Sequence, residues 1–312
     1  MTGTMKAVRY HSFGGSDVLV HEEVDRPVPG RGQVVLRVAG TGFNMLDVAL
    51  RARILELPLA LPHVPNVDVA GVITELGDDV TGWRVGDAVI AFLPPTEPGA
   101  AAEYVAAPAA LLAAAPRTVD LADAAALPVA GLTARQALFD DAGLEPGQRV
   151  LINGAGGGVG GYAVQLAKRA GATVTATASP RSRDRVRSFG ADHVVDHTTT
   201  PLVEAVAGQR FDVALQLVRS SPEETARLAD LVADGGVLAS ATTPGPERVG
   251  RGVRTVQVMV RSDPTRLTEL VDLVDAGELE ITVTQRRPLA DLAAVHDAAV
   301  AGQLSGKTVL IP

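Results

Sequence analysis

The sequence of 312 residues contains no cysteine. Without thiols, it can form no disulfide, no thiolate nucleophile and no zinc site built on cysteine. Aromatic residues are scarce as well, at 3% of the chain, although apolar residues as a whole make up 46%. Alanine, valine and leucine must therefore supply most of the core packing.

Basic charge and long apolar runs are also lacking. The formal net charge is −8, and lysine occurs only at Lys6, Lys168 and Lys307. Nucleic acids and anionic membranes bind basic surfaces, so we expect neither as a partner. No stretch approaches the ~20 apolar residues of a transmembrane helix, and the N-terminal segment lacks the apolar core of a secretory signal. These absences predict a cytoplasmic protein.

The hydrophobic pattern changes along the chain. Up to about residue 115, short valine-rich runs such as "QVVLRVAG" and "VDVAGVITELG" are separated by proline and glycine turns, which is typical of a barrel-like β domain. Strands and helices then alternate, which predicts a parallel sheet with helices on both faces. The segments "ITVTQRRPL" and "GKTVLIP" indicate a return to the first domain. The predicted domains are therefore residues 1–126, 127–262 and the returning segment 263–312.

A glycine-rich turn joins a predicted strand to a predicted helix in "INGAGGGVGGYAVQLAKRAGATV", residues 152–174. Such a turn brings bare backbone close to a ligand and directs unpaired N–H groups at the positive end of the helix dipole. This arrangement predicts a site for the pyrophosphate of a dinucleotide; the alternative is a turn that only packs strand against helix. The predicted cofactor-binding residues here are Gly154, Gly156, Gly157, Gly158, Val159 and Gly160.

The end of the next strand indicates which dinucleotide is bound. Sites that prefer NAD carry an acidic residue about 20 residues after the glycine turn, to bind the ribose 2′-hydroxyl. Here the position is Ser179, followed by Arg181 and Arg183, which would bind a 2′-phosphate. We therefore predict NADPH as the cofactor. Alternatively, the arginines form a solvated helix face, because alternate residues of a helix lie about 200° apart and cannot all reach one phosphate.

Several stretches, in order along nearly the whole chain, resemble the medium-chain dehydrogenase/reductase superfamily, and within it the zinc-independent quinone oxidoreductase (zeta-crystallin-like) branch. These stretches are "GFNMLDVALR", "VPNVDVAGVITELGDDVTGWRVGDAV", "AAALPVAGLTARQAL", the glycine turn with its helix, "FGADHVVDH" and "GKTVLIP". The resemblance implies a GroES-like β domain built from both chain ends around a central Rossmann domain, with cofactor and substrate in the cleft between them. It also implies a homodimer, formed by pairing strands within Arg254–Val260.

The resemblance further implies the chemistry. Members of the family use NADPH to reduce quinones, or the C=C bond of α,β-unsaturated carbonyls. Zinc-dependent relatives place a cysteine at the position of Asn44 and Gly-His-Glu at Asn66–Asp68, so this cysteine-free chain is predicted to hold no metal. Its histidines are scattered, and the only close pair, His193 and His197, lies in a predicted strand. A zinc alcohol dehydrogenase is therefore rejected.

Four further residues are carried over or singled out as site residues. Asn44 and Asp47 match the family's Asn-x-x-Asp pair and are predicted to be catalytic, with Asn44 donating a hydrogen bond to the substrate carbonyl; both could instead be turn-forming residues. Thr133 matches a residue near the nicotinamide, although it could cap a helix. Thr242 follows a strand at the edge where Rossmann ligands bind. Asp68 is interpreted as structural.

One loop departs from the family pattern. Relatives read Asp-x-Val-Gly-Gly after the fourth Rossmann strand, whereas this chain reads "QLVRS" at residues 216–220. Arg219 is a hypothetical partner for an acidic substrate, or else a solvated side chain. The predicted activity is hydride transfer from NADPH to a quinone. The alternatives are an enoyl or alkenal reductase, and a protein that binds NADPH without turnover.

Overall fold

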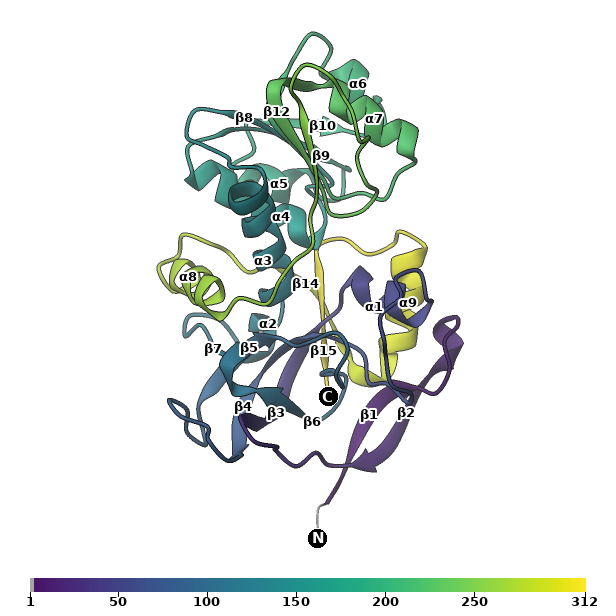
Figure 1. Ribbon diagram of the computed structural model, residues 1–312, viewed down its shortest axis with the longest axis vertical. Coiled ribbons are helices and arrows are strands. Elements are labelled where there is room, and N and C mark those ends of the chain that lie inside the picture. The colour runs from purple at the N-terminus through teal and green to yellow at the C-terminus, as the bar shows by residue number, and fades with distance from the viewer. Residues whose placement is uncertain (1–2) are drawn as a thin grey trace. The chain divides into compact units, whose positions relative to one another are not determined.

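The chain divides into two compact units. Unit 1 comprises the chain up to Val129 together with Ser262–Pro312, and unit 2 comprises Ala130–Arg261. This computed structural model describes residues 3–312, coloured along the chain in Figure 1. Unit 1 is thus assembled from two segments that are far apart in the sequence, with unit 2 inserted between them.

Unit 2 contains one parallel sheet with the strand order β10-β9-β8-β11-β12-β13. The chain starts in the middle of the sheet, moves outward to one edge, returns to the centre and moves to the other edge, which is the order of the Rossmann fold. The strands are β8 (Arg149–Asn153), β9 (Thr173–Ala178), β10 (His193–Asp196), β11 (Phe211–Gln216), β12 (Val232–Ser240) and β13 (Arg254–Gln257). The predicted edge strand "VRTVQVMV" is therefore shorter than expected.

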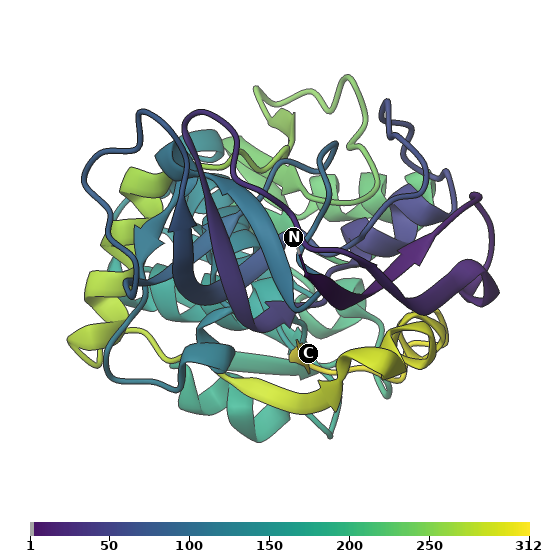
Figure 2. The ribbon, with the colours of Figure 1, turned by 90° about the horizontal axis from the view of Figure 1, so that it is seen from below.

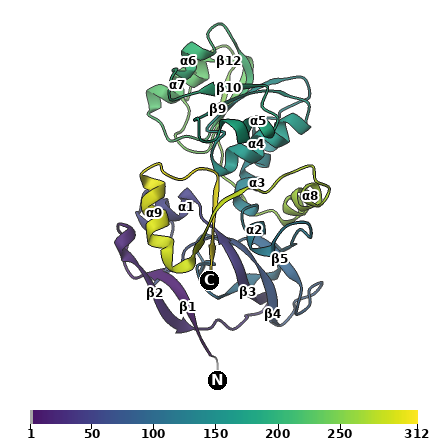
Figure 3. The ribbon, with the colours of Figure 1, turned by 180° about the vertical axis from the view of Figure 1, so that it is seen from behind.

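Helices cover both faces of this sheet. Figures 1 and 3, which look from opposite sides, show α4 and α5 on one face and α6 and α7 on the other. Right-handed crossovers require this change of face when the chain reverses direction across the sheet. The helices are α4 (Gly158–Arg169), α5 (Arg183–Ser188), α6 (Leu202–Ala205) and α7 (Pro222–Asp230), and α3 (Pro128–Arg135) leads into a π-helical turn (Gln136–Asp141). Buried residues such as Leu151, Phe211 and Leu228 form one core between sheet and helices.

Unit 1 is built mainly from a seven-stranded sheet with the order β14-β15-β3-β4-β5-β7, in which β6 also pairs with β3. A separate antiparallel hairpin, β1-β2, accompanies it. The strands are β1 (Thr4–Tyr10), β2 (Leu19–Asp25), β3 (Gln33–Gly42), β4 (Asp68–Leu76), β5 (Ala88–Phe92), β6 (Tyr104–Pro108), β7 (Ala113–Ala114), β14 (Val283–Pro288) and β15 (Lys307–Ile311). The helices are α1 (Met45–Arg51), α2 (Leu121–Ala124), α8 (Pro264–Asp275) and α9 (Leu292–Val300), with short 3₁₀ turns at Ser16–Val18, Ala109–Leu111 and Leu289–Asp291.

The two ends of the chain meet within unit 1. Strand β15 pairs with β3, placing Leu310 opposite Thr41. Leu310 also packs in a core with Val8 of β1 and with Leu292 and Val295 of α9. Figure 2 shows the C-terminal segment (yellow) beside the N-terminal hairpin (purple). The predicted fold class, a doubly wound parallel sheet with a β domain formed from both chain ends, is confirmed.

No helix within residues 3–312 has both the length and the apolar character needed to cross a membrane.

Truncating the returning strand tests how far unit 1 depends on it. Leu310 is completely buried, so Leu310→Ala is expected to lower the free energy of unfolding of unit 1 by about 2–5 kcal/mol through lost burial and the cavity left behind. The single tryptophan, Trp83, packs against the core of unit 1, so its fluorescence during urea denaturation reports on this unit.

The matched control is Val300→Ala, at a side chain that is 67% exposed, for which a change within about 0.5 kcal/mol is expected. Equal effects of the two substitutions would show that β15 adds little to unit 1.

Candidate functional site

Asp47 joins the start of α1 to a neighbouring loop of unit 1. Asn44 immediately precedes the helix, and its backbone N–H donates to Asp47 Oδ2 at 2.9 Å. The other oxygen, Asp47 Oδ1, accepts the backbone N–H of Asn66 at 3.1 Å. A carboxylate in the first turn of a helix satisfies otherwise unpaired N–H groups there and is favoured by the helix dipole. The carboxylate of Asp47 therefore holds two backbone segments together: the residue before α1, Asn44, and the loop at Asn66.

The side chain of Asn44 faces a buried ion pair. The ammonium group of Lys307 donates to Phe43 O at 3.1 Å, Asn44 Oδ1 at 2.8 Å and Asp68 Oδ2 at 3.0 Å. The amide of Asn44 donates in turn to Asp68 Oδ2 at 2.9 Å and to Gly42 O at 3.3 Å. Every N–H of the ammonium group thus has an acceptor. We call Asn44, Asp68 and Lys307 the lysine cluster.

The lysine cluster is removed from water. The side chains of Lys307 and Asp68 are 5% and 0% exposed. The second carboxylate oxygen, Asp68 Oδ1, accepts the backbone N–H of Val129 at 2.8 Å, in the first turn of α3. A buried pair of this kind gains little over apolar residues of the same shape, but losing one partner leaves an uncompensated buried charge. Lys307 and Asp68 must therefore be present together.

Burial changes the acidity of Asp47. Desolvation raises the pKa of its carboxyl group from 3.8 to about 7, against the opposing effect of its hydrogen bond from the Asn44 backbone. This value already includes the negative charge of Asp68, which contributes to the rise, and Lys307 and the Asn66 N–H, which oppose it. A carboxyl group with this pKa is partly protonated near neutral pH.

In unit 2, the turn between β8 and α4 needs its glycines. Gly154 has φ +99°, a conformation that side chains disfavour. A Cβ at Gly160 would lie 2.4 Å from Gly154 O, and a Cβ at Gly156 would lie 2.4 Å from Ser182 Oγ. Gly157 precedes α4, and no side chain caps the helix. The N–H groups of the first turn, including those of Gly158 and Val159, thus face a bare glycine cradle that fits a pyrophosphate.

The residues after β9 are placed differently from one another. Ser179 directly follows the strand and is half-buried. Arg181 is exposed and makes no hydrogen bond or ion pair with any residue in the range 3–312. Arg183 instead forms an ion pair with Asp196 at the end of β10. Of the two arginines predicted to bind a phosphate, only Arg181 has an uncommitted guanidinium group. Sequence reasoning overlooked Arg185, which donates to Gly156 O at 3.0 Å and so braces the glycine turn.

The altered loop after β11 is held by a polar network. Gln216 is fully buried; its Oε1 accepts from Asn153 Nδ2 at 2.8 Å and its Nε2 donates to Ser220 Oγ at 2.9 Å. Asn153 Oδ1 accepts from Thr177 Oγ1, which accepts from the N–H of Gly154, both at 2.8 Å. The carboxyl ends of β8, β9 and β11 are thereby tied to the glycine turn. Gln216 replaces an acid of the family pattern with a residue that both donates and accepts.

The other predicted residues of unit 2 lie on separate elements. Thr242 follows β12, and its hydroxyl donates to Val218 O at 2.9 Å. This hydrogen bond links Thr242 to the altered loop at residues 216–220. Within the described chain, Arg219 has no hydrogen-bond or ion-pair partner, and it is exposed. Thr133 is buried on α3. Contact of these three residues with cofactor or substrate stays a prediction.

Comparison with known proteins agrees with this geometry. Residues 30–117 match the alcohol dehydrogenase GroES-like domain, and residues 189–310 match the zinc-binding dehydrogenase family. The chloroplastic quinone-oxidoreductase QR1 of Triphysaria versicolor is 33% identical to this chain, over 99% of the chain and 98% of that protein. The chain belongs to the quinone oxidoreductase branch of the medium-chain dehydrogenase/reductase superfamily.

Other members of the superfamily extend the comparison. The quinone oxidoreductase structure from Coxiella burnetii superimposes with a TM-score of 0.92 at 29% identity, covering 99% of this chain and all of that one. A 2-haloacrylate reductase from Burkholderia sp is 33% identical, over 97% of both chains. This member of the quinone oxidoreductase branch is thus an oxidoreductase, and its family implies a nicotinamide cofactor. Among residues 3–312, no three or more His, Cys, Asp or Glu side chains gather as a metal site would require.

Removing the charge of Lys307 tests the lysine cluster. Lys307→Met leaves Asp68 buried and unpaired, so the free energy of unfolding of unit 1 is expected to fall by about 3–5 kcal/mol. Urea denaturation followed through Trp83 measures the loss.

The control for this variant is Arg31→Met. Its ion pair with Asp79 has side chains that are 82% and 58% exposed, and such pairs contribute at most about 1 kcal/mol. Losses of the same size in both variants would contradict a structural role for the buried pair.

Proposed function

We propose that this oxidoreductase is NADPH-dependent and zinc-independent and transfers hydride to a quinone. The observation that carries the cofactor assignment is the glycine cradle at α4 followed by Ser179 and the uncommitted Arg181, with no carboxylate directly after β9. The quinone assignment is supported by the quinone oxidoreductases among the similar proteins. Zinc independence is supported by the absence of cysteine from the sequence.

The residues of unit 2 would bind the cofactor as follows. The N–H groups at the start of α4 bind the pyrophosphate, and Ser179 and Arg181 bind the 2′-phosphate through charge-assisted hydrogen bonds. Arg183 can also bind the 2′-phosphate, but its guanidinium group would then interact with both the phosphate and Asp196. Thr133 and Thr242 contact the nicotinamide part. When bound, the nicotinamide supplies the hydride.

The residues of unit 1 would bind and polarise the acceptor. Both N–H groups of the Asn44 amide are engaged, but its bond to Gly42 O is long, at 3.3 Å. Exchanging this bond for one to the substrate oxygen makes Asn44 a donor to the charge that develops there. Lys307 donates to the same amide at Oδ1, which increases the acidity of its N–H groups. Asp47 keeps the Asn44 backbone in place.

A second candidate function is reduction of a C=C bond next to a carbonyl. It is favoured by Arg219, an exposed guanidinium group on the altered loop with no partner in the described chain. A 2-haloacrylate reductase is among the similar proteins, and a haloacrylate carries a carboxylate. Arg219 would bind such a carboxylate. A third candidate is a protein that binds NADPH without turnover. An acceptor assay distinguishes it from the two reductases.

The exposed edge of unit 2 suggests how two copies associate. Among residues 3–312, strand β13 pairs only with β12, which leaves its other edge without a paired strand and available to a strand of a second copy. We propose that the homodimer forms here, within Arg254–Val260.

The activity is tested by the oxidation of NADPH, followed by absorbance, with metal-free protein and a panel of acceptors. The panel holds a benzoquinone, a naphthoquinone, an alkenal, an enoyl thioester and a haloacrylate, with NADH in parallel. We expect turnover of the quinones, with NADPH preferred. Turnover of only the unsaturated carbonyls would move the assignment to C=C reduction, and binding of NADPH without turnover of any acceptor would contradict catalysis.

The cofactor preference is tested by Arg181→Ala. Loss of one guanidinium–phosphate interaction, about 1.5–3 kcal/mol, is expected to raise the Kd of NADPH roughly tenfold or more and to leave the Kd of NADH unchanged. Arg187→Ala, which removes an exposed arginine on the nearby helix α5, is the control and is expected to change neither value. Equal weakening of NADPH and NADH, or none, would sink the assignment of the 2′-phosphate site.

A further inference from the structure

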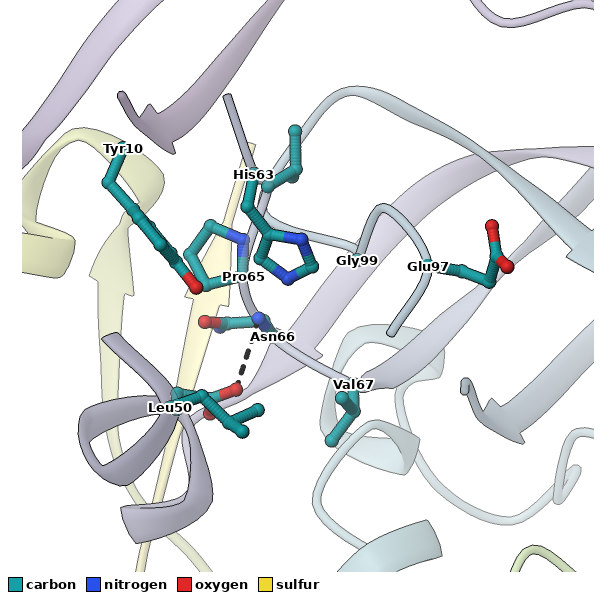
Figure 4. Close-up of a pocket in the computed structure, with 10 residues that line it drawn as sticks. Tyr10, Leu50, His63, Pro65, Asn66, Val67, Glu97 and Gly99 are labelled. Atoms are coloured by element: carbon teal, nitrogen blue, oxygen red, sulfur yellow. Dashed lines mark hydrogen bonds between the residues drawn. The ribbon is translucent and has the colours of Figure 1, made fainter. Parts of the chain in front are cut away.

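A small pocket lies within unit 1 beside Asp47. Tyr10, His63, Asn66 and Asp47 contribute polar groups to its lining. Its cavity volume of about 10 Å³ corresponds to one water molecule. Figure 4 shows the side chains of Tyr10, His63 and Asn66 close together, whereas the carboxylate of Glu97 points away.

Asn66 is the unusual residue of this pocket. Its side chain is 0% exposed, and neither its oxygen nor its nitrogen has a hydrogen-bond partner among residues 3–312. Its backbone has φ +71° and is held by the bond from its N–H to Asp47 Oδ1. A buried amide without partners costs about 1–3 kcal/mol, so its presence requires a compensating interaction. The amide is fixed in position beside a cavity with room for one water molecule.

The neighbouring side chains supply the remaining hydrogen bonds. Burial raises the pKa of Tyr10 to about 12 and lowers the pKa of His63 to about 4, so both are neutral at pH 7. The phenol hydroxyl donates, and the neutral imidazole both donates and accepts. With the Asn66 amide, these groups provide the three or so hydrogen bonds that a buried water makes.

We propose that the pocket binds one water molecule, and that this water carries protons between solvent and Asp47, which serves as a proton store for the reduction. This inference rests on the proposed function. Each hydride added to a quinone or an enone leaves an anion that takes up one proton. The O–H bond of the neutral Asp47 carboxyl breaks, the proton passes to that anion, and the resulting carboxylate is reprotonated through the water.

The surroundings of Asp47 suit a group that alternates between two protonation states. The charges that act on it are the Asp68 carboxylate and the Lys307 ammonium. With Asp47 neutral, the charges of Asp68 and Lys307 cancel, and ionisation leaves one negative charge in the region. Both Asp47 oxygens accept backbone N–H groups in either state, so the fold need not change. The pKa of about 7 places the exchange in the physiological range.

The proton store is tested first without turnover. Infrared difference spectra over a pH titration detect the C=O stretch of a protonated carboxyl group, and Asp47→Asn identifies its band. We expect a midpoint of about 7 for the wild-type protein. In Val67→Ile, an added methylene enters the pocket in place of the water, so the midpoint should rise by about one pH unit, a tenfold change in the dissociation constant. Deuterium exchange of the carboxyl proton should slow at least tenfold.

Tyr10→Phe provides a second, gentler variant. It removes one hydrogen-bond donor with little change of shape, so the midpoint should move in the same direction by less. The controls repeat the substitutions away from the pocket: Val28→Ile, at an exposed side chain, and Tyr104→Phe, on β6. A wild-type midpoint below about 5, or midpoints and exchange rates that Val67→Ile and Tyr10→Phe leave unchanged, would overturn the proposal.

The role in the reduction is tested by the pH dependence of kcat at saturating NADPH. The store donates only when protonated, so kcat should fall as the pH rises through the infrared midpoint, and this limb should move with the midpoint in Val67→Ile. If the pH at which kcat falls is the same in Val67→Ile as in the wild-type protein, the proton-store role is overturned, but the assignment as a quinone reductase is not. If no acceptor is reduced, that role fails together with the proposed function, and the infrared titration still decides whether water links Asp47 to solvent.

Discussion

The buried contact between Lys307 and Asp68 is the constraint on which unit 1 depends. Neither charge reaches water, so each must be satisfied by the other and by fixed dipoles. The ammonium group binds Asn44 beside α1, and the carboxylate binds the first turn of α3. One ion pair thereby joins β4, β15 and the starts of two helices, and the residue predicted to bind substrate is part of it.

The fold was predictable because its signals are local. Valine-rich runs, glycine turns and alternating strands and helices are read within short windows, and they gave the correct fold class. The glycine turn of unit 2 belongs to the same kind of signal. The positive φ of Gly154 is a local backbone property, and a Cβ at Gly160 would meet the backbone of Gly154 and Ala155. Edge strand β13 was predicted too long, because the apolar residues that continue the run lie beyond its last pairing with β12.

The parts of the site that escaped prediction depend on distant partners. Lys307 gave no signal as a lone lysine in "GKTVLIP", because its partner Asp68 lies 239 residues away in the sequence. Arg183 was grouped with Arg181, but the acid that binds it comes from the next strand. Gln216 marked a departure from the family pattern, and only the fold shows that it bridges Asn153 and Ser220. Composition and spacing do not contain these contacts.

The position of Lys307 in the chain also sets an order for assembly during synthesis. A ribosome makes the chain from the N-terminus, and domains generally fold as they become available. All of Ala130–Arg261 is made before Lys307, so unit 2 has its complete set of strands while Asp68 still lacks its counter-ion. The nascent β domain must therefore leave Asp68 in contact with water until β15 is made. The inserted unit is completed first, and the unit that begins the chain is completed last.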